Sequence, residues 1–366
     1  MTDNRPQMKP WIAQIHAYVP GRSTGADGRS LVKLSANENP LGCSPKVHEA
    51  LAGQRPHHLY PDPDATALRE AIGALHAIDQ SRIVCGTGSG ECLHGAVQAF
   101  AGPGDEVVCS RYSFSLYPLL AHKVGARIVY ADPRDYAADV DNLIACVTDR
   151  TRVVLLDNPN NPVGSFLPRR EVARLHAALP SDVLLIIDQA YAEYLDEDAD
   201  DGGMDLAAAH DNVLVTRTFA KAYGIAGERV GWATGAPHLI AALNRLRGAF
   251  NVTSGGQKAA LAALSDQDFV TRSKASNRTA RAQFVSAVES LGNHGLRALP
   301  SEGNFVLVLC EGALTAGAAL DALAHGGYAV RHLPSQGLPE ALRITIGTQE
   351  QMDDVAHILR AAAQAA

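Results

Sequence analysis

The segment from Thr216 to Gly231 carries residue types that suit chemistry on an aldehyde bearing a phosphate. Lys221 follows a short apolar run, and an amine in such a place can form an imine with an aldehyde. Thr218 stands three residues before it and Arg229 eight residues after it, and a hydroxyl and a guanidinium are suitable phosphate ligands. Taken alone, Lys221 would more often be an ordinary solvated lysine, so this interpretation needs support from other residues.

Two further segments place polar side chains after buried apolar runs. Asp188 follows Val183–Ile187, and its carboxylate would keep a pyridine nitrogen protonated, so that the ring accepts electrons from a substrate carbanion. Asn161, in the turn Asn158–Gly164, could donate to a phenolate oxygen on the same ring, and Tyr191 could share that oxygen. The ordinary alternatives are a helix cap for Asp188, a turn former for Asn161 and a packed ring for Tyr191. Together these groups predict pyridoxal 5′-phosphate as the cofactor.

A glycine-rich turn between a strand and a helix provides a candidate phosphate cradle. Backbone N–H groups at the start of that helix would bind the phosphate at Gly88, Ser89 and Gly90. A dinucleotide fingerprint is disfavoured, because Glu91 stands where the third glycine is required, and the next acidic residues precede the following strand instead of ending it.

The elements that must position these residues alternate between short apolar runs and helical stretches. This alternation predicts an α/β protein whose parallel strands are buried on both faces. We expect strands at 106–109, 127–130, 153–156, 183–187 and 213–215, and helices at 90–101, 116–124 and 169–178, the last opened by Pro168 near its first turn.

The pattern changes after Leu264, where we expect a long helix over 268–291 and strands at 304–309 and 341–346. The proline- and glycine-containing N-terminus suits an arm that crosses another surface. We therefore predict an arm with part of a small domain over 1–36, a large cofactor-binding domain over 37–270 and a small domain over 271–366.

Composition favours small-molecule chemistry. The 366 residues are 46% hydrophobic and 19% charged, and the formal net charge of -7 has no single-sign block, so neither nucleic acid nor membrane is an expected partner. The six cysteines contain no C-x-x-C pair, which suggests neither a zinc site nor disulfides, and we expect no metal. Without a signal-like or membrane-spanning run, we expect a cytoplasmic protein.

Over essentially its whole length the chain resembles the fold-type I aminotransferases, and most closely the histidinol-phosphate aminotransferases. The resemblance rests on six motifs in the family's order, which are Leu34–Gly42, Tyr60–Pro63, Asn158–Gly164, Asp188–Tyr191, Thr216–Gly231 and Leu342–Thr348. It implies a fold-type I transferase dependent on pyridoxal phosphate, with a large domain built on a mostly parallel central sheet flanked by helices, plus a smaller α+β domain.

The resemblance also implies roles for the cofactor residues. Lys221 would carry the Schiff base and shuttle protons, with Asp188 on the pyridine nitrogen and the phenolate oxygen held by Asn161 and Tyr191. Thr218 and Arg229 fall at phosphate positions, Phe114 falls where the family stacks an aromatic ring on the cofactor, and Tyr60 matches a residue that reaches the phosphate from the neighbouring subunit of a homodimer.

Two departures from the family pattern bear on phosphate binding. Gly90 stands where an aspartate is usual, and Ala220 stands where a serine commonly precedes the lysine. The backbone donors survive both changes, but one phosphate hydroxyl is lost. We expect these changes to lower the affinity for the cofactor without preventing its binding, since Thr218, Arg229 and Tyr60 remain.

The remaining resemblances concern the substrates, an amino donor and a 2-oxo acid. Arg343 matches the residue that binds the carboxylate of glutamate, Arg331 a second arginine for the phosphate of histidinol phosphate, and Tyr18 an aromatic residue that closes over the substrate; Asn37 is a further substrate-binding candidate. Either arginine could instead be solvated.

The implied reaction converts L-histidinol phosphate and 2-oxoglutarate to imidazole-acetol phosphate and L-glutamate, in histidine biosynthesis. Three alternatives stay open: an aromatic-amino-acid aminotransferase on the same scaffold, an amino-acid-phosphate decarboxylase that uses the same cofactor residues, and a non-catalytic binding module.

Overall fold

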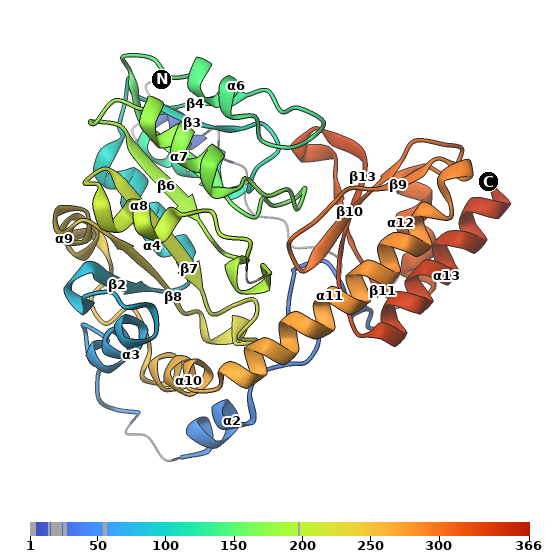
Figure 1. Cartoon of the computed structure of the whole chain (residues 1–366), viewed down its shortest axis with the longest axis horizontal. Coiled ribbons are helices and arrows are strands. Elements are labelled where there is room, and N and C mark those ends of the chain that lie inside the picture. Colours follow the sequence, from blue (N-terminus) through green and yellow to red (C-terminus); the bar gives the residue numbers. More distant parts are fainter. Residues whose placement is uncertain (1–4, 14, 16–23, 25–27, 54–56, 197) are drawn as a thin grey trace.

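Two sheets, each covered by helices, make up most of the chain (Figure 1). The computed structural model describes residues 5–13, 15, 24, 28–53, 57–196 and 198–366. We refer to the seven-stranded sheet as the large sheet and to the four-stranded sheet as the small sheet. The large sheet matches the mostly parallel central sheet that was expected, and the small sheet matches the expected smaller α+β domain.

The large sheet is parallel except for one strand. Its strand order is β2-β8-β7-β6-β5-β3-β4, and only β8 runs antiparallel to its neighbours. The strands are β2 (Ile83–Gly86), β3 (Glu106–Ser110), β4 (Arg127–Ala131), β5 (Thr151–Asp157), β6 (Leu184–Asp188), β7 (Val213–Thr218) and β8 (Gly231–Gly235).

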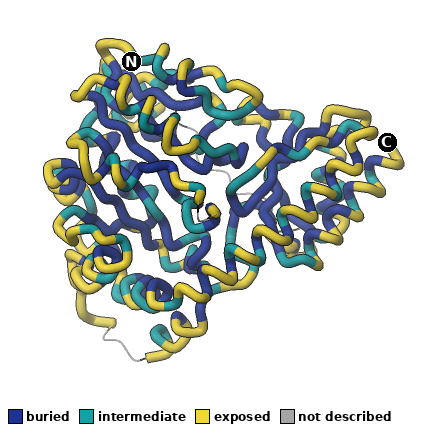
Figure 2. Tube along the Cα trace, viewed as in Figure 1, coloured by how far each residue is buried: buried dark blue, intermediate teal, exposed yellow. Residues whose placement is uncertain are grey.

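Helices cover both faces of the large sheet, which explains why its central strands are apolar on both sides. Figure 2 shows these strands as buried tubes between more exposed helices. One face packs on α4 (Ser89–Phe100), α5 (Leu116–Val124) and α9 (Pro237–Leu246), and the other on α6 (Val140–Ala145), α7 (Arg169–Ala178) and α8 (Gly203–Ala209). A third cluster lies under α2 (Pro45–Ala52), α3 (Thr66–His76) and α10 (Ser254–Leu264).

The small sheet is antiparallel throughout, in the order β12-β13-β10-β9. Its strands are β9 (Leu296–Ala298), β10 (Phe305–Cys310), β12 (Arg331–Leu333) and β13 (Leu338–Thr345). One face packs on α11 (Gln267–Glu289), α12 (Ala316–His325) and α13 (Gln349–Ala365). The opposite face is turned toward the large sheet, and its buried side chains contact Val163.

The N-terminal part of the described chain joins the C-terminal half. The strand β1 (Val32–Lys33) pairs in parallel with β11 (Tyr328–Ala329), and Leu34 packs in the core beneath the small sheet. Before it lies the short helix α1 (Pro10–Ala13). The domain boundaries remain predictions, and the one at residue 270 falls inside α11.

Most predicted elements are present, with ends shifted by one to three residues. The helices expected at 116–124 and 169–178 match α5 and α7, and Pro168 is the N-cap residue of α7, next to its first turn as expected. The reversed strand β8 was not predicted, because its sequence Gly-Trp-Ala-Thr-Gly lacks a continuous apolar run. Glycine is required at Gly231, since an added Cβ would lie 2.1 Å from the Ser89 nitrogen.

Candidate active site

The carboxyl ends of three neighbouring strands bring polar side chains together. In the register of the large sheet, Asp157 on β5 lies beside Asp188 on β6, and Asp188 lies beside Thr216 on β7. Because parallel strands end at the same edge of a sheet, this edge is where α/β proteins place ligands. All three side chains are buried.

Asp188 is held by two hydroxyl groups. The Thr216 hydroxyl donates to Oδ1 at 2.9 Å, and the Tyr117 hydroxyl approaches Oδ2 at 3.4 Å. Burial raises the pKa of Asp188 to about 6, while these hydrogen bonds and the charge of Lys221 oppose that rise. The carboxyl group is therefore mostly ionised at neutral pH, although it lies in the interior.

Lys221 follows β7 and turns its amine toward the chain segment that crosses from β1. Its Nζ donates to the carbonyl of Ala36 at 3.0 Å and lies 5.7 Å from the centre of the Tyr191 ring. Burial, followed by the charge of Arg343, lowers the pKa of Lys221 to about 7. A large fraction of this amine is thus unprotonated and nucleophilic at neutral pH.

Asn37 connects Tyr191 with the small sheet. Its side-chain amide donates to the Tyr191 hydroxyl at 2.8 Å, and its Oδ1 accepts from the Thr345 hydroxyl at 3.1 Å. The backbone of Asn37 adopts φ of 57°, a left-handed conformation that asparagine tolerates better than most residues. Burial raises the pKa of Tyr191 to about 12, so its hydroxyl is protonated at neutral pH and can donate.

A second group of predicted residues meets at the amino end of α4. Across three strands, Gly86, Gly231 and Thr218 lie side by side in register. Arg229 reaches the adjacent turn, since a Cβ added to Gly88 would lie 3.0 Å from its Nη2. The structure therefore gathers the helix start, a hydroxyl and a guanidinium into one cradle.

Of the two departures from the family pattern, the first is Gly90, and the packing around it does not require a glycine. A Cβ added there would meet only Leu116, at 3.9 Å. The other departure, Ala220, has its backbone nitrogen bonded to the Thr218 hydroxyl at 3.1 Å. A side chain at residue 90 would thus fit this cradle.

Arg343 brings the small sheet to the site. Its Nη1 donates to Asn161 Oδ1 at 2.5 Å and its Nη2 to the carbonyl of Ser35 at 2.7 Å. Arg331 pairs with Arg343 in the antiparallel register of β12 and β13, so both side chains lie on the same face of the small sheet.

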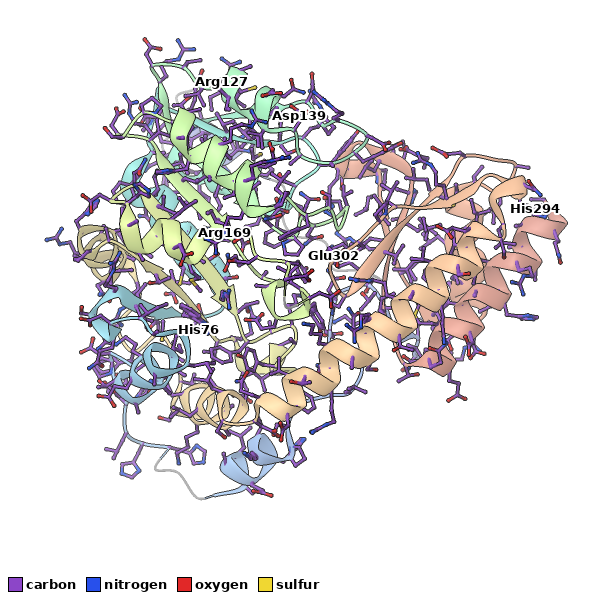
Figure 3. All side chains as sticks on the ribbon, in the orientation of Figure 1. His76, Arg127, Asp139, Arg169, His294 and Glu302 are labelled. Atoms are coloured by element: carbon purple, nitrogen blue, oxygen red, sulfur yellow. The ribbon has the colours of Figure 1, made fainter. Side chains whose placement is uncertain are left out.

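The turn Asn158–Gly164 lies between the two sheets. The carbonyl of Gly164 accepts from the backbone nitrogen of Glu302, which is labelled in Figure 3 where the small sheet approaches the large one. Gly164 has φ of 92°, and an added Cβ would lie 2.2 Å from Ser301 Oγ. Glycine at this position therefore allows the turn to approach the small sheet closely.

Two further predicted residues, Phe114 and Tyr60, are described by the structure, and a third is not. Phe114, in the loop before α5, has its backbone nitrogen bonded to Asp157 Oδ2 at 3.1 Å and its ring against Tyr117. Tyr60 is 80% exposed in the single chain and stacks on Phe250, with 4.4 Å between ring centres. Tyr18 lies outside the described residues.

Sequence reasoning missed several neighbours of the site. Asp157 ends an apolar run as Asp188 does, and this parallel was the available signal. Thr216 and Tyr117 carry no local signal, because only the register of the sheet and the packing of α5 bring them to Asp188. Among the described residues, no group of three or more His, Cys, Asp or Glu side chains could hold a metal ion.

Comparisons with known proteins agree with this arrangement. Residues 29–359 match the family model for aminotransferase class I and II. A crystal structure of histidinol-phosphate aminotransferase from Sinorhizobium meliloti, in complex with pyridoxal-5′-phosphate, superposes with a TM-score of 0.90 over 100% of both chains, at 29% identity. An aspartate aminotransferase mutant from Thermus thermophilus, 21% identical over 98% of this chain and 100% of its own, shares the fold with a TM-score of 0.82.

The chain is a pyridoxal-phosphate-dependent aminotransferase of class I and II, with the fold-type I architecture. It is 64% identical to histidinol-phosphate aminotransferase from Erythrobacter litoralis over 366 residues, 100% of both chains. It is 55% identical to the enzyme of the same name from Sphingopyxis alaskensis, over 99% of both chains. Within its class, the chain belongs to the histidinol-phosphate aminotransferases. The predicted family, fold class and cofactor are thereby confirmed.

Proposed function

We propose that this chain transfers the amino group of L-histidinol phosphate to 2-oxoglutarate, giving imidazole-acetol phosphate and L-glutamate in histidine biosynthesis. The observation that carries the proposal is the pair Arg331 and Arg343 on one face of the small sheet, in a chain of this family. Both substrates are anionic, and two neighbouring guanidinium groups suit a phosphate and a carboxylate.

The side chains at the strand ends fit pyridoxal phosphate. Gly88, Ser89, Gly90, Thr218 and Arg229 would hold its phosphate, because the amino end of α4 and the guanidinium meet in the cradle described above. An added Cβ at Gly231 would lie 2.1 Å from the Ser89 nitrogen. The turn that begins α4 therefore packs directly against the backbone of β8, which fixes the position of its N–H groups.

When bound, pyridoxal phosphate supplies an aldehyde that condenses with amines and a pyridine ring that draws electrons from the substrate α-carbon. Asp188 would hold a proton on the ring nitrogen, since its carboxylate is buried yet ionised at neutral pH. Asn161 and Tyr191 would donate to the phenolate oxygen, and Phe114 would lie against the ring. The amide of Asn37 would orient the Tyr191 hydroxyl.

Lys221 would act as the base and acid of the reaction. Its amine would remove the proton from the substrate α-carbon and deliver it to the cofactor's C4′ carbon. A pKa of about 7 suits both steps, because the amine gains and loses a proton with little cost near neutral pH. Arg343 would hold the glutamate carboxylate and Arg331 the phosphate of histidinol phosphate.

The cofactor assignment is tested by the visible absorbance of the purified protein. Lys221→Ala is expected to abolish the absorbance of the lysine-bound cofactor and all turnover, whereas Lys258→Ala, an exposed lysine on α10, leaves both unchanged. An unchanged spectrum in Lys221→Ala contradicts the assignment. Substrate choice is tested by steady-state kinetics with histidinol phosphate, phenylalanine and tyrosine as donors, and by assaying carbon dioxide.

Turnover of histidinol phosphate with formation of glutamate supports the proposal. No turnover of histidinol phosphate, with turnover of phenylalanine or tyrosine, indicates the aromatic enzyme instead. Release of carbon dioxide without glutamate indicates a decarboxylase. Failure to gain a visible absorbance when pyridoxal phosphate is added would indicate a non-catalytic binding module.

We further propose a homodimer in which Tyr60 reaches the phosphate of the neighbouring subunit. The exposure of the Tyr60 ring on a well-packed chain supports this arrangement. The closing role of Tyr18 rests on the family resemblance alone. Mixing Lys221→Ala subunits with Tyr60→Ala subunits is expected to restore activity, because one site of each hybrid then carries neither change; no recovery in confirmed hybrids contradicts shared sites.

The described residues contain no helix long and apolar enough to cross a membrane. All six cysteines are free, which is typical of a reducing compartment and supports the proposal that the enzyme works in the cytoplasm.

A further inference from the structure

Asp157 is a buried carboxylate to which the proposed reaction gives no role. It is the last residue of β5, it is 5% exposed, and it lies in register with Asp188 on β6. Two buried carboxyl groups thus stand side by side at the strand ends. Only Asp188 is accounted for by the cofactor.

The Asp157 carboxylate joins two loops that follow different strands. Its Oδ2 accepts from the backbone nitrogen of Asn161 at 2.8 Å and from that of Phe114 at 3.1 Å. Its Oδ1 accepts from the Asn160 side-chain amide at 3.1 Å, and that amide also donates to the carbonyl of Tyr112 at 2.9 Å. One oxygen atom therefore sets the separation between Phe114 and Asn161.

We propose that Asp157 is a positioning residue for the cofactor ring. The inference rests on the proposed function, in which Phe114 lies against the ring and Asn161 donates to its phenolate oxygen. Because a single oxygen of Asp157 accepts from both backbones, it fixes the aromatic face and the amide donor relative to each other. The ring is thereby held in one orientation relative to Asp188.

The energetic cost of this arrangement supports a role beyond stability. Burial, with a further contribution from Asp188, raises the pKa of Asp157 to about 7 against the lowering by the Asn161 N–H. A carboxylate placed in the interior beside another carboxylate destabilises the fold relative to a neutral side chain of the same shape. The gain is a pair of convergent hydrogen bonds on one acceptor, which apolar residues cannot provide.

The test compares three variants at residue 157 with a control on the same strand. Asp157→Ala removes both acceptors. Although its NH2 group can no longer accept from the Asn160 amide, Asp157→Asn keeps one oxygen that can accept from both backbones. Asp157→Ser has a hydroxyl that reaches at most one of them, and it serves as the probe where the alanine variant does not fold. Val154→Ala makes a cavity elsewhere on β5, in the core beneath α6 and α7.

The measurements are the circular dichroism of the bound cofactor in its visible band, which reports ring orientation, and the Kd of pyridoxal phosphate. We expect Asp157→Ala to lose most of the visible dichroism and to raise the Kd about 30-fold, which is the effect of losing two hydrogen bonds of ordinary strength. Asp157→Ser should lie in between, and Asp157→Asn should largely restore both values. Val154→Ala should lower Tm but leave both unchanged.

The proposal is overturned if Asp157→Ala or Asp157→Ser retains the wild-type dichroism and Kd. It is also overturned if Asp157→Asn behaves like Asp157→Ala, or if Val154→Ala changes both measurements to the same extent. Failure of the proposed function is a separate result, because it is read from the turnover of histidinol phosphate by the wild-type protein, whereas the visible dichroism and the Kd report only the bound cofactor.

Discussion

The large sheet contributes to the site through the carboxyl ends of its strands, whereas the small sheet contributes through one face of two neighbouring strands, β12 and β13. At the strand ends, Asp157, Asp188 and Lys221 have pKa values shifted by burial. On the small sheet, Arg343 donates from mid-strand to Asn161 and Ser35. We therefore expect the groups that exchange protons to lie on the large sheet, and the small sheet to supply fixed positive charge, which binds anionic substrates and also lowers the pKa of Lys221.

The largest effect is expected at the end of β6. Asp188→Asn should lower kcat by about 1000-fold, because the ring nitrogen loses the carboxylate that keeps it protonated, while the cofactor still binds. Asp182→Asn is the matched control, since it precedes the amino end of the same strand and is 74% exposed. Kinetics and visible absorbance are measured together, and equal kcat values for the two variants would show that the strand end has no special role.

A smaller and different effect is expected on the small sheet. Arg343→Gln should lower kcat/KM for glutamate by about 100-fold through loss of a charge-assisted pair, with a nearly unchanged visible spectrum. Arg297→Gln on β9 removes an arginine that pairs with Glu311, the residue after β10, and should leave the kinetics unchanged. If Arg343→Gln instead abolishes the visible absorbance, the small sheet is also needed to bind the cofactor, and the proposed division of roles between the two sheets is wrong.

The pH dependence of Lys221 sharpens the comparison further. With a pKa of about 7, its unprotonated fraction should rise about tenfold between pH 6 and pH 8 and then level off. The rate at which the cofactor-free protein combines with pyridoxal phosphate should follow this curve. An ordinary lysine would keep gaining about tenfold per pH unit over the same range, and a rate without a plateau would show that burial does not depress this pKa.

The smallest effect on catalysis is expected in the core of the small sheet. Leu342→Ala removes a fully buried side chain of β13 and should lower the free energy of unfolding by about 3 kcal/mol, with kcat changed by less than about twofold. Leu214→Ala makes an equivalent change on β7, which leads to Lys221, and should also raise the cofactor Kd. Denaturant titration measures the free energy of unfolding of both variants, and cofactor titration measures their Kd for pyridoxal phosphate. Equal Kd values for Leu342→Ala and Leu214→Ala would contradict the proposal that only the large sheet supports cofactor binding.

The fold, and the meeting of several candidate cofactor residues at the strand ends, could be predicted because the patterns that indicate them are local in the sequence. Asp188, Asn161 and Lys221 each follow an apolar run, and such runs end at one edge of a parallel sheet. The family motifs then fixed the order of these elements. The reversed strand β8 carried no comparable pattern.

The remaining features depend on contacts between distant segments. Asn37 meets Tyr191 across 154 residues, and Arg343 meets Asn161 across 182 residues. The spacing of apolar residues within a short stretch of sequence cannot predict a contact between residues so far apart in the chain. The linking role proposed for Asp157 likewise depends on a loop that follows β3, forty-three residues away in sequence.

The segment near Asn37 contacts the small sheet and the residues that follow β6 and β7, and these contacts bear on how the chain folds during its synthesis. Asn37 bonds to Thr345, 308 residues later, and β1 needs β11 as its partner. During synthesis, the central strands of the large sheet emerge long before β13. We therefore expect the carbonyl of Ala36 and the amide of Asn37 to reach Lys221 and Tyr191 only when translation is almost complete. A nascent chain stalled before residue 338 should therefore contain every cofactor residue yet hold an unfinished pocket.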